Sequence, residues 1–183
     1  IACAVNICAQ FCANPGKQHY KAALQIMKYL AGTVEYGIIY GRKRTDHIPY
    51  AALCAYSDSS WADDPDDRTS RSGIMLWSWG GPIEWRSSKQ TAQALSTTEA
   101  EYMAVCGAVK SVVWARRLFA EFGYGDLSIP DRDSVKTEAE LEGAKPVTVF
   151  EDNTGAIVWS HNAGVDHQRT KHIDLKWHYV RAQ

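Results

Sequence analysis

Three acidic residues lie at positions where a buried strand or helix does not normally carry a charge. Asp58 follows the apolar segment AALCAY, Glu101 lies on the apolar side of a helical pattern over residues 99–119, and Asp152 follows the strand-like segment VTVFE. Burying unpaired carboxylates costs free energy, so three that converge need a counter-charge, and a divalent metal ion is the usual one. The sequence therefore predicts a metal-dependent enzyme.

Two of these acids also have an ordinary structural interpretation. Asp58 precedes two serines, which suits an Asx turn, and Asp152 directly precedes a helix, where an acid is a common cap. Taken alone, neither residue decides between the two interpretations. Topology favours a shared site, because a covering helix and two strands can bring all three acids to one point.

The helical segment offers two glutamates, and their positions separate them. Ser96-Thr97-Thr98-Glu99 matches a capping box, so Glu99 is expected to have a structural role. A competing box from Thr98 to Glu101 would leave the alignment of Glu101 with the apolar stripe unexplained. Glu101 is therefore expected to point toward the sheet, together with the rest of that stripe, which consists of Val105, Ala108, Val112, Ala115 and Phe119.

The elements around these acids predict an α/β domain with a mixed sheet. They are strands over 50–59, 72–81 and 82–91, a helix over 97–122 that closes at Gly123, a fourth strand over 147–152, a short helix over 154–162 and a terminal helix from Thr170. Tight connections between the first three strands imply an antiparallel meander, broken after the second strand at Gly80-Gly81-Pro82. Residues 124–146 are charged and without periodicity, which indicates a surface insertion.

The N-terminal region predicts one amphipathic helix. Asn14 is the expected cap, Pro15 the first helical residue and Gly32 the end. Its apolar stripe consists of Tyr20, Ala23, Leu24, Met27 and Leu30. Residues 34–43 then have the pattern of a strand and residues 44–49 that of a loop.

Composition fits one globular domain without a membrane partner. The chain has 183 residues, 45% of them hydrophobic, and its Trp and Tyr side chains are expected mostly in the core. No apolar run is long enough to cross a bilayer. Because the net charge is only −1, a nucleic acid would have to be held by a local basic patch or through metal.

Cysteine usage indicates a reducing, intracellular setting and not secretion. The five cysteines form no CxxC pair and have no matching histidine spacing, which argues against disulfides and against zinc. Cys8 and Cys12 are expected to be small buried hydrophobes. The acidic residues around Pro65 are expected in a solvated turn. The N-terminus, without initiator Met or basic leader, looks like a cut from a longer protein.

Five motifs in order resemble the ribonuclease H domain of copia-type LTR-retrotransposon polyproteins. They are YSDSSWADDPDDRTSRSG, GGPIEWRSSKQ, LSTTEAEYMAV, VFEDNTGAIVWS and HQRTKHIDLKWHYVR. The resemblance covers residues 50–183 apart from the charged insertion. Upstream, residues 10–38 are similar to the segment that joins the reverse transcriptase to that domain.

The resemblance implies a ribonuclease H fold that hydrolyses the RNA strand of an RNA–DNA hybrid, beside the reverse-transcriptase domain of the same polyprotein. It divides the chain into residues 1–49, the tail of the connecting segment, and residues 50–183, the ribonuclease H-like domain. Asp58, Glu101 and Asp152 match the first three of the family's four metal-binding acids. The fourth belongs to a final strand and helix that this chain lacks, and Asp174 is the nearby candidate to replace it.

The resulting hypothesis is hydrolysis with two Mg²⁺ or Mn²⁺ ions, because these hard cations prefer oxygen ligands. Asp58 would bridge both ions, with Glu101 on one and Asp152 on the other. Polar and basic side chains near the site would contact the hybrid, although for any single cation a solvated surface charge is the alternative. These are Ser59, Arg71, Lys89, Gln93, Ser96, Thr98, Asn153, Arg169, Lys171 and His172.

Three other classes of protein stay open. A catalytically incomplete ribonuclease H-like module would serve as a structural or nucleic-acid-binding part of a reverse transcriptase, and would bind no divalent ion. An integrase or transposase relative uses a similar acidic triad, but generally brings its glutamate late in the domain. A glycosidase carboxylate pair is the third class.

Overall fold

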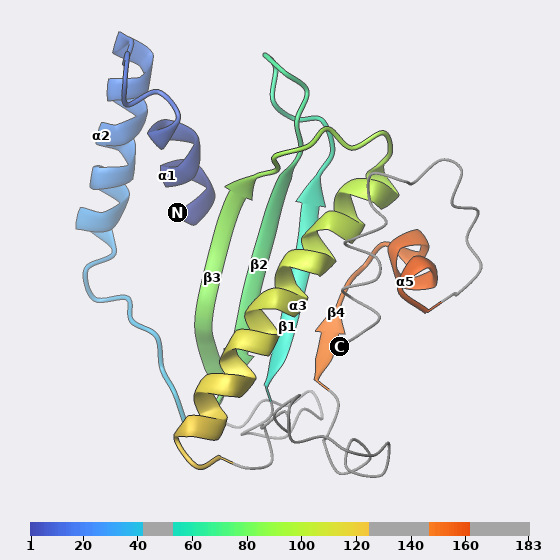
Figure 1. Cartoon of the computed structure of the whole chain (residues 1–183). Coiled ribbons are helices and arrows are strands. Elements are labelled where there is room, and N and C mark those ends of the chain that lie inside the picture. Colours follow the sequence, from blue (N-terminus) through green and yellow to red (C-terminus); the bar gives the residue numbers. More distant parts are fainter. Residues whose placement is uncertain (42–52, 125–146, 162–183) are drawn as a thin grey trace.

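The computed structural model describes residues 1–41, 53–124 and 147–161. Four strands form one sheet in the order β3-β2-β1-β4, and its strands are β1 (Cys54–Ser60), β2 (Arg71–Ser78), β3 (Gly81–Lys89) and β4 (Thr148–Phe150). The described helices are α1 (Ala2–Ala9), α2 (Lys17–Gly32), α3 (Thr97–Glu121) and α5 (Thr154–His161) (Figure 1). The predicted terminal helix and nearly all of the predicted insertion, residues 124–146, lie outside the described residues.

The sheet confirms the predicted α/β class and the antiparallel meander. β1 pairs antiparallel with β2 and β2 with β3, whereas β4 joins the other edge of β1 as a parallel strand. A parallel neighbour requires a crossover, and α3 lies in the connection between β3 and β4. The arrangement is compatible with a ribonuclease H-like fold.

The hairpin between β2 and β3 turns one residue earlier than the sequence pattern predicted. Trp79 and Gly80 have φ angles of 48° and 75°, and both left-handed residues are what a two-residue type I′ turn requires. Pro82 consequently lies within β3, opposite Trp77, next to a register shift in the pairing. Proline is tolerated there because β3 is an edge strand.

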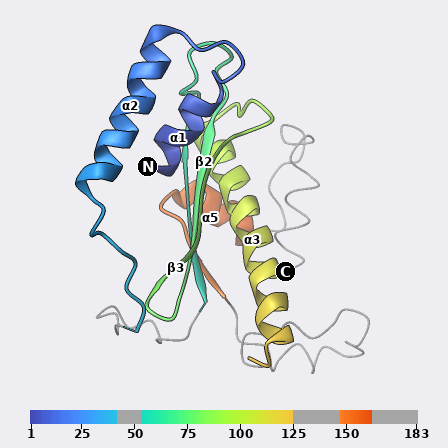
Figure 2. The ribbon, with the colours of Figure 1, turned by 90° about the vertical axis from the view of Figure 1, so that its left-hand side faces the viewer.

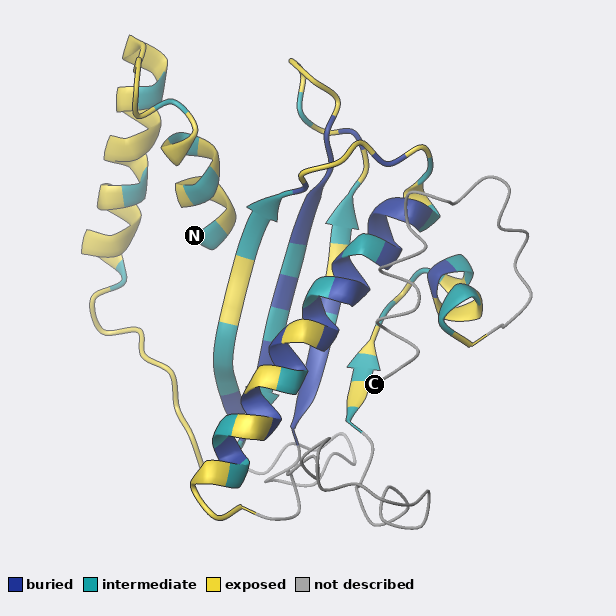
Figure 3. Ribbon diagram, viewed as in Figure 1, coloured by how far each residue is buried: buried dark blue, intermediate teal, exposed yellow. Residues whose placement is uncertain are grey.

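The core lies between α3 and the sheet. The stripe predicted on α3 from Val105 to Phe119 is buried throughout, and Figure 3 shows the buried band of the helix turned toward the strands. It packs against the side chains of β1 and β2. The principal cluster consists of Leu53, Ala55, Ile74, Leu76, Ala108, Val112, Ala115 and Phe119. At about 1.5–3 kcal/mol for each large side chain, this burial is the main source of the domain's stability.

A second small cluster positions α5. Tyr102 of α3 is fully buried and packs against Ala156 and Trp159 of α5. Its ring meets the Trp159 ring edge to face at a centroid distance of 6.1 Å. The start of α3 is thereby fixed next to the segment that follows β4.

The N-terminal helices lie on the side of the sheet away from α3 (Figure 2). α2 begins later than predicted, because Gly16 and not Asn14 is the cap, and its N–H donates to Nδ1 of His19 at 2.9 Å. Residues 34–41 form no strand, so that expectation was wrong for the described part of the segment. Instead, Tyr40 donates its hydroxyl proton to the carbonyl of Pro82 at 2.7 Å.

Several side chains expected in the core are exposed. On α2, Tyr20 is 66% and Met27 63% exposed, and between α1 and α2 lies an apolar groove of about 890 Å³. Among the described Trp and Tyr residues only Tyr102 is buried, so the expectation that most Trp and Tyr lie in the core was wrong for the described part of the chain. Cys8 is only half-buried and Cys12 is exposed, against the expectation of burial. No helix in the described ranges is long and apolar enough to span a membrane.

Candidate metal centre

The parallel pairing of β1 with β4 brings two of the predicted acids together. The last paired residues are Tyr56 and Phe150, whose rings stack at 4.8 Å. Asp58 and Asp152 each lie two residues beyond that pair, at equivalent positions on the two neighbouring segments of the chain. Because parallel strands keep their register, the two carboxylates leave the sheet at the same place.

Glu101 supplies the third carboxylate from α3, which crosses the sheet above β1 and β2. Its side chain is only 7% exposed. One carboxylate oxygen from each of Asp58, Glu101 and Asp152 lies within 4.8 Å of the other two. The convergence predicted from the sequence is therefore present, while the catalytic roles of the three residues stay predictions.

The alternative structural roles of the two aspartates, an Asx turn at Asp58 and a helix cap at Asp152, are not found in the described structure. Asp58 pairs with Gly73 inside β1, which continues to Ser60, so no Asx turn forms there. The cap of α5 is Asn153, whose Oδ1 accepts the N–H of Ala156 at 2.9 Å. Neither aspartate is needed to terminate an element.

The predicted capping box at the start of α3 is present in a shifted form. Ser96 Oγ accepts the N–H of Glu99 at 3.2 Å, and Glu99 Oε2 accepts the N–H of Leu95 at 2.7 Å, one residue before the cap. Glu99 thus fixes the helix start, as expected. Glu101, half a turn further on, is left to face the two aspartates.

The electrostatics of Glu101 are those of a carboxylate that lacks a counter-charge. Its pKa is raised to about 7, mainly by burial and also by the charges of Glu151, Asp58 and Asp152, while the nearby Ser59 hydroxyl acts in the opposite direction. Its Oε2 atom is buried and has no hydrogen-bond partner. A buried carboxylate with an unpartnered oxygen, on a side chain that meets two other carboxylates, is favourable only when a proton or a cation lies against it.

A fourth carboxylate, Glu151, lies beside the three and was not predicted. Its Oε2 accepts the Ser57 hydroxyl proton at 2.8 Å and its Oε1 accepts the N–H of Asn153 at 3.1 Å. Burial raises its pKa, and the charges of Asp152 and Asp58 act in the same direction. A usable signal was present: alternation along β4 places Glu151 with Val147 and Val149, which pack against the core.

The donor set fits a hard divalent cation. Three carboxylates provide oxygen ligands and negative charge, which Mg²⁺ and Mn²⁺ prefer, and no histidine or cysteine belongs to the group. The unpartnered oxygen of Glu101 supplies the independent sign that a positive ligand belongs there.

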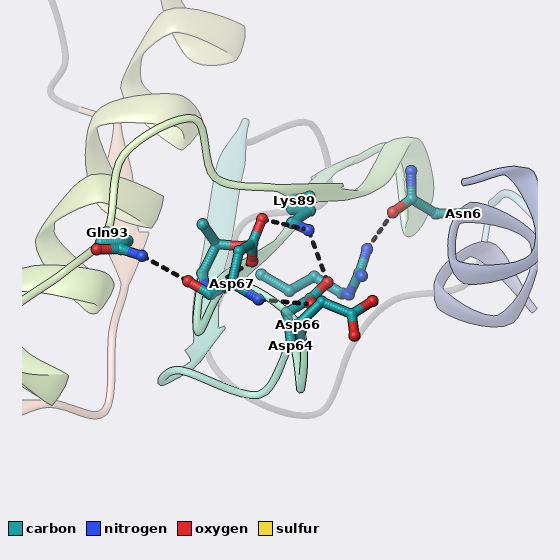
Figure 4. Close-up of polar contacts among 8 residues, drawn as sticks. Asn6, Asp64, Asp66, Asp67, Lys89 and Gln93 are labelled. Atoms are coloured by element: carbon teal, nitrogen blue, oxygen red, sulfur yellow. Dashed lines mark hydrogen bonds and ion pairs between the residues drawn. The ribbon is translucent and has the colours of Figure 1, made fainter. Parts of the chain in front are cut away.

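Two basic side chains that were predicted to contact nucleic acid have partners within the protein. Arg71 is buried and its guanidinium donates to Oδ1 of Asn6 in α1. Lys89 forms ion pairs with Asp64 at 2.7 Å and Asp67 at 2.8 Å, as Figure 4 shows. The acidic turn is real, but it is fixed to β3 by Lys89 instead of being freely solvated.

The other predicted contact residues differ in where they lie and in what they contact. Gln93 donates to the backbone carbonyl of Asp67, also shown in Figure 4. Ser59 and Thr98 lie at the site, and the Ser59 hydroxyl is buried without a hydrogen-bond partner. Ser96 and Asn153 serve as the caps described above. Outside the described residues lie Arg169, Lys171, His172 and Asp174.

Known proteins similar to this chain include two polyproteins from plant transposons. The chain is 36% identical over 181 residues to the retrovirus-related Pol polyprotein from transposon TNT 1-94 of Nicotiana tabacum, and 34% identical over 183 residues to that from transposon RE1 of Arabidopsis thaliana. The alignments cover 99% and 100% of this chain but only 12% and 11% of the two polyproteins. The chain therefore spans a small part of these relatives.

A third relative has a different context. The chain is 40% identical over 114 residues to secreted RxLR effector protein 161 of Plasmopara viticola, an alignment that covers 62% of this chain and 77% of that protein. No family model matches the chain. No solved structure matches it either.

Proposed function

This chain belongs to the retrovirus-related Pol polyproteins of copia-type transposons, and from that premise we propose that it hydrolyses the RNA strand of RNA–DNA hybrids. The observation that carries the proposal is the meeting of Asp58, Glu101 and Asp152 with one buried Glu101 oxygen left unpartnered. Hybrid hydrolysis belongs to retrotransposon replication, the role that membership of the family supports. Two-metal hydrolysis of a phosphodiester uses cations to neutralise phosphate charge, and three carboxylates that meet are suitable ligands for such ions.

The three acids would hold two Mg²⁺ or Mn²⁺ ions between β1, β4 and α3. When bound, such ions polarise the scissile phosphate and lower the pKa of a water nucleophile. The protein contributes a rigid frame, because Asp58 lies in a paired strand and Glu101 on a helix with a buried stripe. Asp152 is held by the cap that Asn153 forms at the start of α5.

Recognition of the hybrid would depend on short polar groups beside the acids. A hybrid carries 2′-hydroxyls on its RNA strand only, and these both donate and accept hydrogen bonds. The unpartnered Ser59 hydroxyl and the Thr98 hydroxyl, 3.5 Å from Asn153 Oδ1, are suited to such contacts. Arg71 and Lys89 are not part of this proposal, because both have partners within the protein.

We place the domain inside the cell beside the reverse-transcriptase domain of the same polyprotein, with residues 1–49 as the tail of the connecting segment. All five cysteines are free, which suits a reducing compartment. The exposed apolar side chains of α1 and α2 suit a region that packs against another domain.

The test is cleavage of a labelled RNA–DNA hybrid in Mg²⁺ and in Mn²⁺. Asp58→Asn keeps the size of the side chain but removes a ligand charge, and should reduce the cleavage rate at least about 100-fold. Asp63→Asn, in the exposed part of the acidic turn, is the matched control and should leave the rate unchanged. Equal rates in Asp58→Asn and the unaltered protein would contradict the proposal. Absence of cleavage in either metal would favour the incomplete-module alternative, and cleavage that persists without metal would contradict the two-metal site.

A further inference from the structure

Glu151 connects the two strands that carry the aspartates. Its Oε2 accepts from the Ser57 hydroxyl of β1, at 2.8 Å, and its Oε1 accepts from the backbone N–H of Asn153, at 3.1 Å. Ser57 directly precedes Asp58, and Asn153 directly follows Asp152. One carboxylate therefore holds the residues adjacent to both aspartates.

The sheet register explains this contact. β1 and β4 pair in parallel up to Tyr56 and Phe150, so Ser57 and Glu151 occupy the next equivalent positions. Backbone pairing in the sheet stops there, since β4 ends at Phe150. Beyond that point the Ser57–Glu151 hydrogen bond connects the two segments in place of backbone pairing. It does so one residue before the two aspartates, whose separation it can fix.

Glu151 also adds charge to the site without joining the group of ligands. Among the neighbouring carboxylates, it raises the pKa of Glu101 more than Asp58 or Asp152 does. It is not among the three residues whose oxygens lie within 4.8 Å of one another. Both of its oxygens are already engaged by Ser57 and Asn153.

We propose that Glu151 is a positioning residue of the cation site, which locks the 151–153 segment to β1 and thereby fixes Asp152 next to Asp58. This inference rests on the proposed metal site. A neutral glutamine could make the same two hydrogen bonds, since its amide oxygen accepts from Asn153 and its NH₂ group donates to the Ser57 oxygen.

The experiment measures the dissociation constant of Mn²⁺ by titration calorimetry on protein freed of metal. Glu151→Ala removes both hydrogen bonds and should weaken Mn²⁺ binding about 10–100-fold, the usual effect of losing a residue that orients a ligand. Glu151→Gln keeps the hydrogen bonds and loses the charge, and should weaken binding by less than about 10-fold. Ser57→Ala removes the tether to β1 but leaves the charge of Glu151, and should weaken Mn²⁺ binding more than Glu151→Gln and toward the size seen in Glu151→Ala. It also serves as the test if Glu151→Ala does not fold.

Glu84→Gln is the matched control. Glu84 on β3 accepts a hydrogen bond from Ser111 at 3.0 Å, a similar Glu–Ser contact far along the sheet from the three acids. This substitution should leave the Mn²⁺ dissociation constant within twofold of that of the unaltered protein. Thermal unfolding in EDTA shows for every variant whether the fold is retained.

The outcomes separate this inference from the proposed function. If Mn²⁺ binds and Asp58→Asn abolishes binding, but Glu151→Ala stays within twofold of the unaltered protein, only the inference about Glu151 fails. If Glu151→Gln loses as much affinity as Glu151→Ala, Glu151 acts through its charge or as a ligand, and the positioning role is wrong. If the unaltered protein binds no Mn²⁺, the metal site and the inference fail together.

Discussion

At the scale of single residues, Glu101 shows most directly how burial and charge conflict in this protein. Its side chain is 7% exposed, its Oε2 has no hydrogen-bond partner, and it shares its side of α3 with apolar residues. Without a cation the protein relieves the conflict by protonation, because the pKa is raised to about 7. The stability of the metal-free protein should therefore fall as pH rises, whereas a carboxylate paired with a cationic side chain makes stability rise with pH.

We predict that the metal-free protein loses stability as pH rises from 5 to 8. A carboxylate whose folded-state pKa is raised stabilises the fold below its unfolded value, 4.5, and that contribution disappears as pH passes the folded value near 7. At about 1.4 kcal/mol for each pKa unit, the change is at most about 3 kcal/mol. The raised pKa of Glu151 acts in the same direction. Urea unfolding in EDTA at several pH values measures the effect.

Glu101→Gln should flatten that pH dependence and raise the stability of the metal-free protein at pH 8, because no charge then needs to be buried. Glu84→Gln serves as the control and should leave the slope unchanged. If stability instead increases between pH 5 and 8, the carboxylates of the site are already compensated and the raised pKa of Glu101 is wrong.

Residue patterns sufficed to predict the three acids but not the fourth. Asp58, Glu101 and Asp152 stood out because each follows or interrupts an apolar pattern. Glu151 does not stand out in this way, because its neighbour Asp152 is the residue that ends the strand pattern. Its partners, Ser57 and the backbone of Asn153, depend on the parallel register of β1 and β4, which a single sequence does not show.

At the scale of elements, predictions held where a segment had a partner in the fold. The three strands of the meander and α3 match their patterns because their apolar sides face one another. Residues 34–41 have strand-forming composition, yet no strand edge pairs with them in the described structure. Strand propensity expresses packing on a sheet more than a backbone preference, so a lone apolar run is weak grounds for predicting a strand.

The close contact between α5 and α3 gives a prediction at this scale. A Cβ atom on Gly155 would lie 2.8 Å from Oγ1 of Thr98 and 3.0 Å from Oδ1 of Asn153, so Gly155→Ala must push α5 away from α3. Overpacking of this kind costs about 1–3 kcal/mol. Because Asn153 caps α5 next to Asp152, the substitution should also weaken Mn²⁺ binding. Chemical unfolding and titration calorimetry measure the two effects.

Gly32→Ala in α2 is the matched control, since a Cβ atom there meets nothing within 4 Å. It should leave Mn²⁺ binding unchanged and stabilise α2 by about 0.5–1 kcal/mol, the ordinary gain of alanine over glycine in a helix. A Gly155→Ala variant as stable as the unaltered protein would mean that α5 is not held tightly against α3.

At the scale of the whole molecule, apolar side chains are buried around the sheet and α3 but largely exposed on α1 and α2. The sheet and α3 enclose the core, while α1 and α2 carry exposed apolar side chains such as Tyr20 and Met27 (Figure 3). The amphipathic pattern of α2 is real, but within the described residues its apolar stripe covers little of the domain. A sequence pattern shows that a helix has an apolar side; it does not show which surface, in this chain or another, receives it.

Charge is also distributed locally, and this leads to a prediction about nucleic-acid binding. The net charge is −1, so the protein has no overall attraction for a hybrid. Its binding should therefore depend only modestly on salt, with log K falling by about 0.9 per log unit of salt for each phosphate contacted. Lys89 should not contribute, because Asp64 and Asp67 hold its ammonium group at 2.7 and 2.8 Å and raise its pKa.

Lys89→Gln should accordingly leave the salt slope of hybrid binding unchanged, while it releases the acidic turn from β3 and makes that turn more sensitive to proteolysis. Fluorescence anisotropy with a labelled hybrid, in Ca²⁺ to bind without cleavage, measures the slope for both proteins between low and moderate salt. Limited proteolysis measures the turn. A slope that becomes shallower by about 0.9 in Lys89→Gln would show that this lysine leaves its two aspartates to bind a phosphate. The acidic turn would then be a partner that competes with the nucleic acid for Lys89, and the ion pairs would describe the unbound protein only.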